Sequence, residues 1–341
     1  MKKTVPIQLA IVLVSLMVLF STEAVSLSIK IKREAYSPAR RVGVTGPNFV
    51  STGLRVFGKG MKVYFSGDTT GSGKSQMTTM TWTLVTKPAG SSASLNVWAK
   101  DSCSFIGDAI GQYIIRCDID SGKFAQDTLF ASTYVGIGAG SPPTGCGIPC
   151  HAAKNPTLIS DWQQTGHATQ FLRGITGQLE VDSTGNGQYG KSCVRCHTTG
   201  WESVTDNGNF GFIARKLAWD STWWKGLTPT SAAASSFFIK WKSMTVLNDL
   251  MTNYPTLAPV ATIGCEVCHG PGAGYLKPTL MSLQNKEYKR ADLIAVGMLV
   301  PTVETCQKCH NKKSPFFQPF DFKTRVQQGN HAHEALKFKH D

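Results

Sequence analysis

The sequence predicts an all-β sandwich in its first part and a mostly irregular and α-helical second part. Residues 27–139 consist of short segments that alternate apolar and polar side chains between Gly, Ser and Thr turns, which is typical of β-strands. Residues 140–341 contain eight of the ten cysteines but few long periodic segments. The Gly- and Pro-containing stretch 138–145 lies between them and predicts a linker.

The N-terminus predicts export. Two lysines precede an apolar stretch from residue 5 to 20, and small residues follow around Ala24 and Ser26. This order is typical of a secretory signal peptide, so we expect residues 1–24 to be removed by cleavage after Ala24 or Ser26. An uncleaved anchor is the alternative, although the stretch is slightly short for a membrane span. After cleavage, no membrane span is expected.

The first part contains several candidate strands. Strand composition is found in residues 62–66, 81–86, 112–119 and 128–137. We expect Trp82 to fill the space between two sheets. Asp108, Gly111 and Tyr113 are expected to form the corner that enters the next strand.

Two cysteines lie outside the motifs described below. Cys103 and Cys117 both fall in the predicted sandwich, and in an oxidising compartment we expect them to pair as a disulfide. A closed loop of about 15 residues contributes about 3 kcal/mol in the chain-entropy model, so this bond would be a structural staple.

Two segments of the first part carry a specific resemblance. They are Trp82-Thr-Leu-Val-Thr-Lys-Pro88-Ala-Gly90-Ser-Ser-Ala-Ser-Leu95 and Asp108-Ala-Ile-Gly111-Gln-Tyr113. The segments resemble the polycystic-kidney-disease (PKD) and immunoglobulin-like sandwich modules of exported microbial proteins. The resemblance implies a role in adhesion, spacing or display, and no catalytic role.

Four motifs in the second part place a histidine directly after a cysteine pair. Three have the spacing Cys-x-x-Cys-His and the first is wider by one residue: Cys146/Cys150/His151, Cys193/Cys196/His197, Cys265/Cys268/His269 and Cys306/Cys309/His310. This pattern is typical of covalently attached c-type haem. Two sulfurs about one helical turn apart can reach the two vinyl groups of one porphyrin, and the next residue directs its imidazole at the iron. The sequence therefore predicts four covalently attached haem c groups.

Zinc binding and plain disulfides are the alternatives, because cysteine pairs at this spacing also serve both purposes. Zinc would not require a histidine after every pair. Histidine accounts for only 8 of the 341 residues, so its presence in this position in all four motifs favours haem.

The remaining histidines match the remaining coordination positions. The motifs use four of the eight histidines as proximal ligands, which leaves His167, His331, His333 and His340. Two imidazoles on each of four irons would use all eight and predict carriers of low reduction potential. His331 and His333 point the same way in an extended segment and could reach two adjacent haems. For His340, next to the C-terminus, a solvated surface position is the alternative.

Porphyrins are expected to take the place of much of the side-chain core in the second part. Segments near residues 232–252 and 286–296 predict helices. Either macrocycle packing or ordinary core filling would suit the aromatic residues Trp162, Phe171, Trp201, Trp219, Trp223, Trp224 and Trp241.

The second part resembles exported multihaem cytochromes of the cytochrome c-554 type over roughly residues 134–275. The matching segments are Asp161-Trp162-Gln-Gln-Thr165-Gly-His167-Ala168, Cys196-His197-Thr198-Thr199-Gly200-Trp201, Asn207-Gly208-Asn209-Phe210 and Cys268-His269-Gly270-Pro271-Gly272. The resemblance implies that His167 is a distal haem ligand. The family often has a further histidine beyond the last segment, where this chain has Tyr275, so the C-terminal histidines are expected to supply the missing ligands.

Electron transfer is the function that these observations favour. The partners would be redox proteins or extracellular electron acceptors, in the periplasm or at the cell surface. The tetrahaem count, the widened first motif and the remote His331 and His333 also resemble filament-forming extracellular cytochromes, which self-assemble through a non-closing contact. The alternative is a multihaem oxidoreductase that acts on a small nitrogen or sulfur compound at an open iron.

The net charge of +13 comes without a basic helix or finger pattern, so nucleic acid is not an expected partner.

Overall fold

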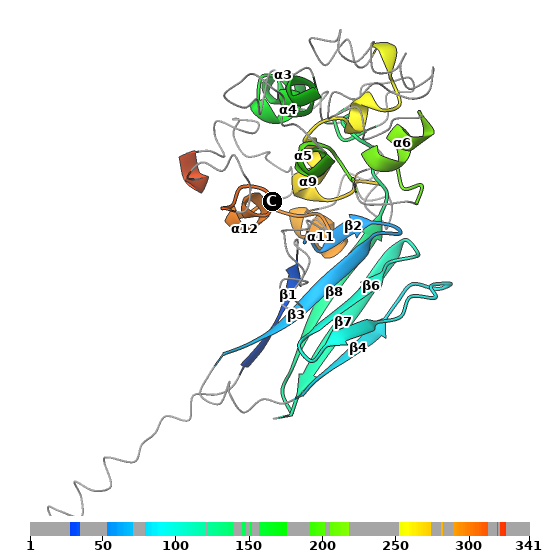
Figure 1. The fold of residues 1–341 in the computed structure, drawn as a ribbon, viewed down its shortest axis with the longest axis vertical. Coiled ribbons are helices and arrows are strands. Elements are labelled where there is room, and N and C mark those ends of the chain that lie inside the picture. Colours follow the sequence, from blue (N-terminus) through cyan, green and yellow to red (C-terminus); the bar gives the residue numbers. More distant parts are fainter. Residues whose placement is uncertain are drawn as a thin grey trace, which may run out of the picture.

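The computed structural model describes residues 28–34, 53–70, 79–120, 122–138, 145–147, 151, 157–175, 191–201, 205–217, 252–273, 281, 289–312, 319 and 321–324. The strands form an elongated part, and the short helices gather at one end of it (Figure 1). Outside the described residues lie the predicted signal peptide, nearly all of the predicted helix at 232–252, Cys150, His331, His333 and His340.

Two four-stranded sheets form the first part, which we call the two-sheet part. The strand orders are β1-β3-β6-β5 and β2-β8-β7-β4, and all neighbours pair antiparallel except β2 and β8. The strands are β1 (Ser28–Glu34), β2 (Val56–Gly58), β3 (Lys62–Thr70), β4 (Met80–Thr86), β5 (Asn96–Ala99), β6 (Ser102–Ile106), β7 (Gly111–Ile119) and β8 (Phe124–Ser132). This arrangement is compatible with the predicted β-sandwich.

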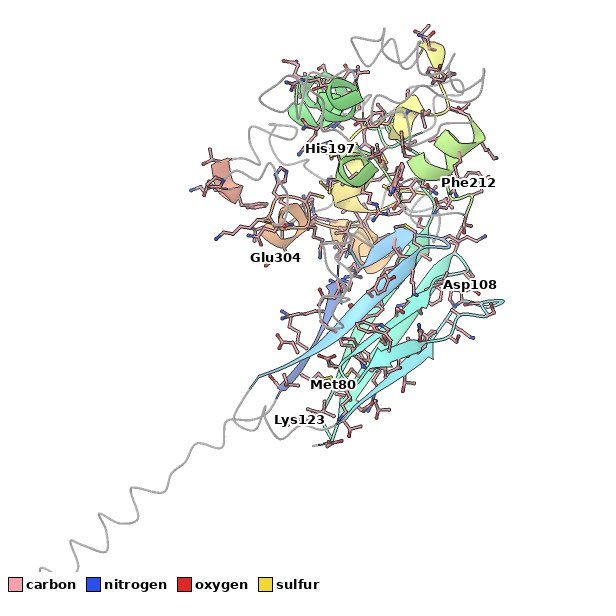
Figure 2. All side chains as sticks on the ribbon, viewed as in Figure 1. Met80, Asp108, Lys123, His197, Phe212 and Glu304 are labelled. Atoms are coloured by element: carbon pink, nitrogen blue, oxygen red, sulfur yellow. The ribbon has the colours of Figure 1, made fainter. Side chains whose placement is uncertain are left out.

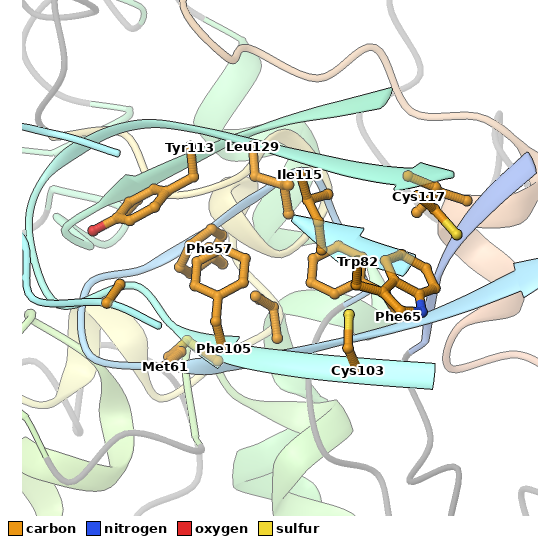
Figure 3. Close-up of a cluster of buried hydrophobic side chains, with 14 of the residues drawn as sticks. Phe57, Met61, Phe65, Trp82, Cys103, Phe105, Tyr113, Ile115, Cys117 and Leu129 are labelled. Atoms are coloured by element: carbon orange, nitrogen blue, oxygen red, sulfur yellow. The ribbon is translucent and has the colours of Figure 1, made fainter. Parts of the chain in front are cut away.

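Side chains from both sheets meet in one apolar core (Figure 3). β7 alternates strictly between buried and half-buried residues, as expected of a strand with one face against a core. Phe105 of β6 lies 5.2 Å from Tyr113 of β7 between ring centres. Trp82 of β4 is buried against Phe65 of β3, with 6.5 Å between ring centres, so Trp82 fills the space between the sheets as predicted.

A polar cluster closes the turn that leads into β7. The Tyr113 hydroxyl donates to the carbonyl of Ala109 at 2.9 Å and accepts from its backbone N–H at 3.0 Å. The Asp108 carboxylate accepts from the backbone N–H and the hydroxyl of Ser92, both at 2.7 Å. These bonds fix the corner that the sequence predicted at Asp108, Gly111 and Tyr113.

Cys103 and Cys117 face each other across the core from β6 and β7, next to Trp82 (Figure 3). Both thiols are buried, and burial raises the pKa of Cys117 to about 12. The two sulfurs are not bonded to each other, so the disulfide stays a prediction.

We expect the exported protein to contain a Cys103–Cys117 disulfide. Mass spectrometry of peptides digested without reduction should recover the two cysteines in one linked species. Reduction is expected to lower the free energy of unfolding by about 3 kcal/mol, because the bond closes a loop of about 15 residues. The Cys103→Ala/Cys117→Ala variant is the control, since reduction should leave its stability unchanged. Two unlinked, alkylatable thiols in the exported protein would contradict the expectation.

Short helices make up the described regular structure of the second part, which we call the helical part. They are α3 (Leu158–Gln163), α4 (Gly166–Ile175), α5 (Lys191–His197), α6 (Phe210–Lys216), η4 (Ala258–Val260), α9 (Cys265–His269), α11 (Arg290–Ala295) and α12 (Val303–Gln307). α11 falls within the helix predicted near 286–296. None of the helices in the described ranges is long and apolar enough to cross a membrane.

Three of the predicted aromatic residues lie in or against the core of the helical part. Phe171 contacts Phe210 edge-on at 5.0 Å between ring centres, and Trp201 stacks on Phe210 at 5.8 Å. Trp162 is buried and donates its indole N–H to the carbonyl of Ile263 at 3.2 Å. The described aromatic residues therefore pack together in one apolar cluster. The other four, Trp219, Trp223, Trp224 and Trp241, lie outside the described residues.

The strand predicted at 128–137 ends earlier, at Ser132, because the residues that follow bond to the helical part. Thr133 pairs with Ala273 in an isolated bridge, and Tyr134 N–H donates to the carbonyl of Asn207 at 2.7 Å. The Asn207 side chain in turn donates to the carbonyl of Lys59 at 2.6 Å. Thr133 and Tyr134, just before the predicted linker, are thus hydrogen-bonded to the helical part, and Asn207 of the helical part is hydrogen-bonded to the two-sheet part. The predicted boundary at residues 139 and 140 stays a prediction.

Candidate cofactor-attachment site

Short helical turns carry the second, third and fourth cysteine–histidine motifs. α5 ends at His197, α9 consists of the third motif alone, and α12 leads directly into Cys309 and His310. Cysteines three residues apart on one turn present both sulfurs on the same side. Of the first motif, Cys146 and His151 are described. The local structure of the three complete motifs is therefore the one that their spacing requires.

Glycines frame α9 on both sides. Gly264 precedes the helix in an extended conformation, and Gly270 ends it with φ +79° and ψ 161°, a region that only glycine adopts readily. A Cβ at Gly270 would lie 2.7 Å from the Cβ of Val56. The turn after the third motif therefore packs directly against β2 of the two-sheet part.

The sulfurs of three motifs converge. A hydrogen bond between the thiols of Cys196 and Cys309, together with burial, raises the pKa of Cys309 well above its usual value. Burial, then the nearby thiols of Cys306 and Cys265, raise the pKa of Cys268 to about 12. These contacts bring half-buried cysteines of the second, third and fourth motifs close together.

Five imidazoles fall into two groups. Burial, then the neighbouring His167 and His310, lower the pKa of His197 to about 4. The rings of His167 and His310 lie 6.1 Å apart between their centres. Burial, then His269, lower the pKa of His151. His197 is therefore a neutral ring at neutral pH, as an imidazole must be to bind a metal. Figure 2 shows His197 among the helices, apart from Asp108 and Lys123 of the two-sheet part.

His269 is held in one orientation. Its Nδ1 lies 2.8 Å from the carbonyl oxygen of Leu299, a hydrogen bond that requires the proton on Nδ1. The lone pair is then on Nε2. A metal-binding histidine commonly has this arrangement, with its other nitrogen donating to a backbone carbonyl.

The segment that contains His167 is positioned by its own motif residues. The Thr165 hydroxyl donates to the carbonyl of Trp162 at 2.7 Å and accepts from the N–H of Ala168 at 3.4 Å, which caps the start of α4. The carbonyl of His167 accepts from the N–H of Ile263 at 3.2 Å. The tryptophan and the threonine of this segment thus set where α4 begins.

Glu266 was not among the predicted site residues. It lies between Cys265 and Cys268, and its side chain is almost fully buried. The carboxylate accepts from the N–H of Val135 at 3.0 Å, of Gly136 at 2.7 Å and of Gly272 at 2.6 Å. Glu266 therefore anchors the third motif to the chain that leaves the two-sheet part. An acidic residue inside a cysteine pair is the sequence signal that could have drawn attention to it.

No family model, no curated protein and no solved structure matches this chain.

Most of the predicted site residues can be placed. The structure brings together the second, third and fourth motifs with His167, and it places His151 near His269. Within the described ranges, no three His, Cys, Asp or Glu side chains form a group that could hold a single metal ion. The described cysteines of the motifs are half-buried, and each pair is followed directly by its own histidine in the sequence. This donor set fits a cofactor that takes two sulfurs and one imidazole from every motif.

Proposed function

We propose that this chain is an exported tetrahaem c-type cytochrome that carries electrons along closely packed haem groups. The observation that carries the proposal is the cysteine–histidine motif, which occurs four times. The contact between the thiols of Cys196 and Cys309 supports it, because adjacent attachment points allow electrons to pass between neighbouring haems.

Each motif would hold one haem through its two cysteines and its histidine. The cysteines would be Cys146, Cys150, Cys193, Cys196, Cys265, Cys268, Cys306 and Cys309, the proximal ligands His151, His197, His269 and His310, and the distal ligands His167, His331, His333 and His340. When bound, the haem groups supply one-electron exchange between ferric and ferrous iron. The protein would orient the imidazoles, as the Leu299 carbonyl does for His269, and exclude water from the irons.

We assign the two-sheet part an immunoglobulin- or PKD-like fold. The order β1-β3-β6-β5 corresponds to the A-B-E-D sheet of a constant-type immunoglobulin sandwich, and β4, β7 and β8 correspond to C, F and G. Trp82 then lies on strand C and Tyr113 near the start of strand F, as in that fold. Cys103 departs from the pattern, because it lies on strand E instead of strand B. The role of this part would be spacing or display at the cell surface.

The haem content tests the proposal. Intact mass of the exported protein, measured after denaturation, should exceed the mass of the processed chain by four haem groups. The Cys193→Ala/Cys196→Ala variant should carry three, because the second attachment site is lost. The Cys103→Ala/Cys117→Ala variant is the matched control and should keep all four. A protein without haem that retains zinc in elemental analysis would refute the proposal.

The same preparation separates the carrier from the oxidoreductase. With two imidazoles on each iron, every haem should be low-spin, and nitrite or hydroxylamine should leave the spectrum unchanged. An iron that stays high-spin at high protein concentration and responds to either compound would favour the oxidoreductase. A high-spin signal that disappears on concentration would mean that a neighbouring subunit supplies a histidine, as in a filament.

A further inference from the structure

His167 and His310 come from distant parts of the sequence, but their rings lie close together. His167 is the second residue of α4, and His310 follows α12 at the end of the fourth motif. Their ring centres are 6.1 Å apart, and the ring planes are inclined by 52°. The two rings do not stack face to face, and at this separation their centres leave room for an atom between them.

The separation is also one that two ligands of a single metal ion can have. Two metal–imidazole bonds of roughly 2 Å each, together with the distance from each nitrogen to its own ring centre, put the ring centres roughly 6 Å apart. Any mutual inclination of the two rings about the common axis is compatible with such binding.

Hydrogen bonds fix the backbone at both rings. The His167 carbonyl is bound by Ile263, as described above. The N–H of His310 donates to the carbonyl of Cys306 at 2.9 Å, and the side chain of Asn311 donates to the carbonyl of Gln307 at 2.8 Å. The distance between the rings is therefore set by two anchored turns.

Among the described histidines, His197 also lies near this pair, because both rings contribute to its lowered pKa. His197 belongs to the second motif, however. The Cys196 thiol of that motif is hydrogen-bonded to the Cys309 thiol of the fourth motif. This contact makes the second and fourth attachment sites neighbours. His197 would therefore be the proximal ligand of its own motif, whereas no cysteine pair precedes His167.

We infer that His167 is the distal ligand of the haem attached through Cys306 and Cys309, on the face opposite His310. The inference rests on the proposed haem content. The pairing connects the segment between the first two motifs to the fourth motif. The haems of the second and fourth motifs would then be neighbours in the row of haem groups.

The test is the spin state of the oxidised protein by electron paramagnetic resonance, in three variants of the full exported chain. His167→Ala should keep four haems by mass while one of them becomes high-spin, and added imidazole should return it to low-spin. Gln163→Ala, an exposed change on the neighbouring helix α3, should keep the wild-type spectrum. His167→Met should stay low-spin with one haem at a higher potential, because Met in place of His raises it.

The haem involved is identified in a background that lacks the fourth attachment site, Cys306→Ala/Cys309→Ala. There, His167→Ala should add no high-spin iron to the three remaining haems. A new high-spin signal in that background would overturn the pairing, because His167 would then serve another haem. A wholly low-spin His167→Ala protein with four haems would overturn the role of His167 as a ligand. Both outcomes leave the tetrahaem proposal intact, whereas a wild-type protein without haem would remove its basis.

Discussion

Replacement of Glu266 by glutamine is expected to lower the free energy of unfolding by roughly 3 kcal/mol or more, since a hydrogen bond to a charged group contributes about 1.5–3 kcal/mol. The carboxylate is buried and accepts from three backbone N–H groups. A glutamine has the same shape, but its amide NH₂ would point at one of these donors. At least one buried N–H would then be left without an acceptor. Guanidinium unfolding, followed by tryptophan fluorescence, measures the change.

Glu304→Gln is the matched control for this substitution. Glu304 lies in the fourth motif's helix α12, where its side chain is exposed (Figure 2). It accepts from the nearby Thr302 hydroxyl at 2.5 Å and from no distant segment in the bonds described. We expect this variant to unfold at the wild-type denaturant concentration. Equal effects of the two substitutions would show that negative charge, and not the three buried bonds, stabilises the motif helices.

Replacement of Gly270 by alanine is expected to destabilise the protein by roughly 3 kcal/mol, the sum of an overpacking cost and a backbone cost. The new Cβ would lie 2.7 Å from the Cβ of Val56, and neither backbone can move without disturbing α9 or β2. The φ of +79° at this position adds strain for any residue with a side chain. Thermal unfolding of the variant should show a correspondingly lower midpoint.

Alanine substitutions at two other glycines distinguish the backbone cost from the overpacking cost. Gly122 has a φ of +75° but open space around it, so Gly122→Ala measures the backbone cost alone. Gly166 has open space without a positive φ, so Gly166→Ala should be neutral. If Gly270→Ala were no worse than Gly122→Ala, the contact between β2 and the third motif would not be tight.

Local sequence patterns predict strands whose apolar residues recur at every second position. They do not predict strand ends that depend on hydrogen-bond partners far away in the sequence. Every second residue from Tyr113 to Ile119 is apolar, so the strand predicted at 112–119 agrees with β7 to within one residue. β2 has only three residues, too few for any periodicity, and it was missed. Residues 133–137 have strand composition, but their hydrogen-bond partners include Asn207 and Ala273. No local pattern contains that information.

The candidate site was predictable in its chemistry and not in its arrangement. The spacing of Cys265, Cys268 and His269 places them on one turn, because the geometry of a helix follows from near neighbours. The burial of Glu266 depends on N–H groups about 130 residues away in the chain, as its bond to Gly136 shows. The meeting of His167 with His310 likewise depends on how α4 and α12 pack, which no sequence spacing encodes.

The carboxylate of Glu266 also limits how this protein could exchange its parts. A β-sheet module could in principle be exchanged for another module if no bond crossed its boundary. Here Val135 and Gly136, at the exit of the sheets, complete the hydrogen bonding of the third motif. A chimera that does not place two backbone N–H groups at these positions would leave the buried carboxylate with only the hydrogen bond from Gly272. The backbone at the exit of the sheets therefore restricts which modules could replace the two-sheet part without destabilising the third motif.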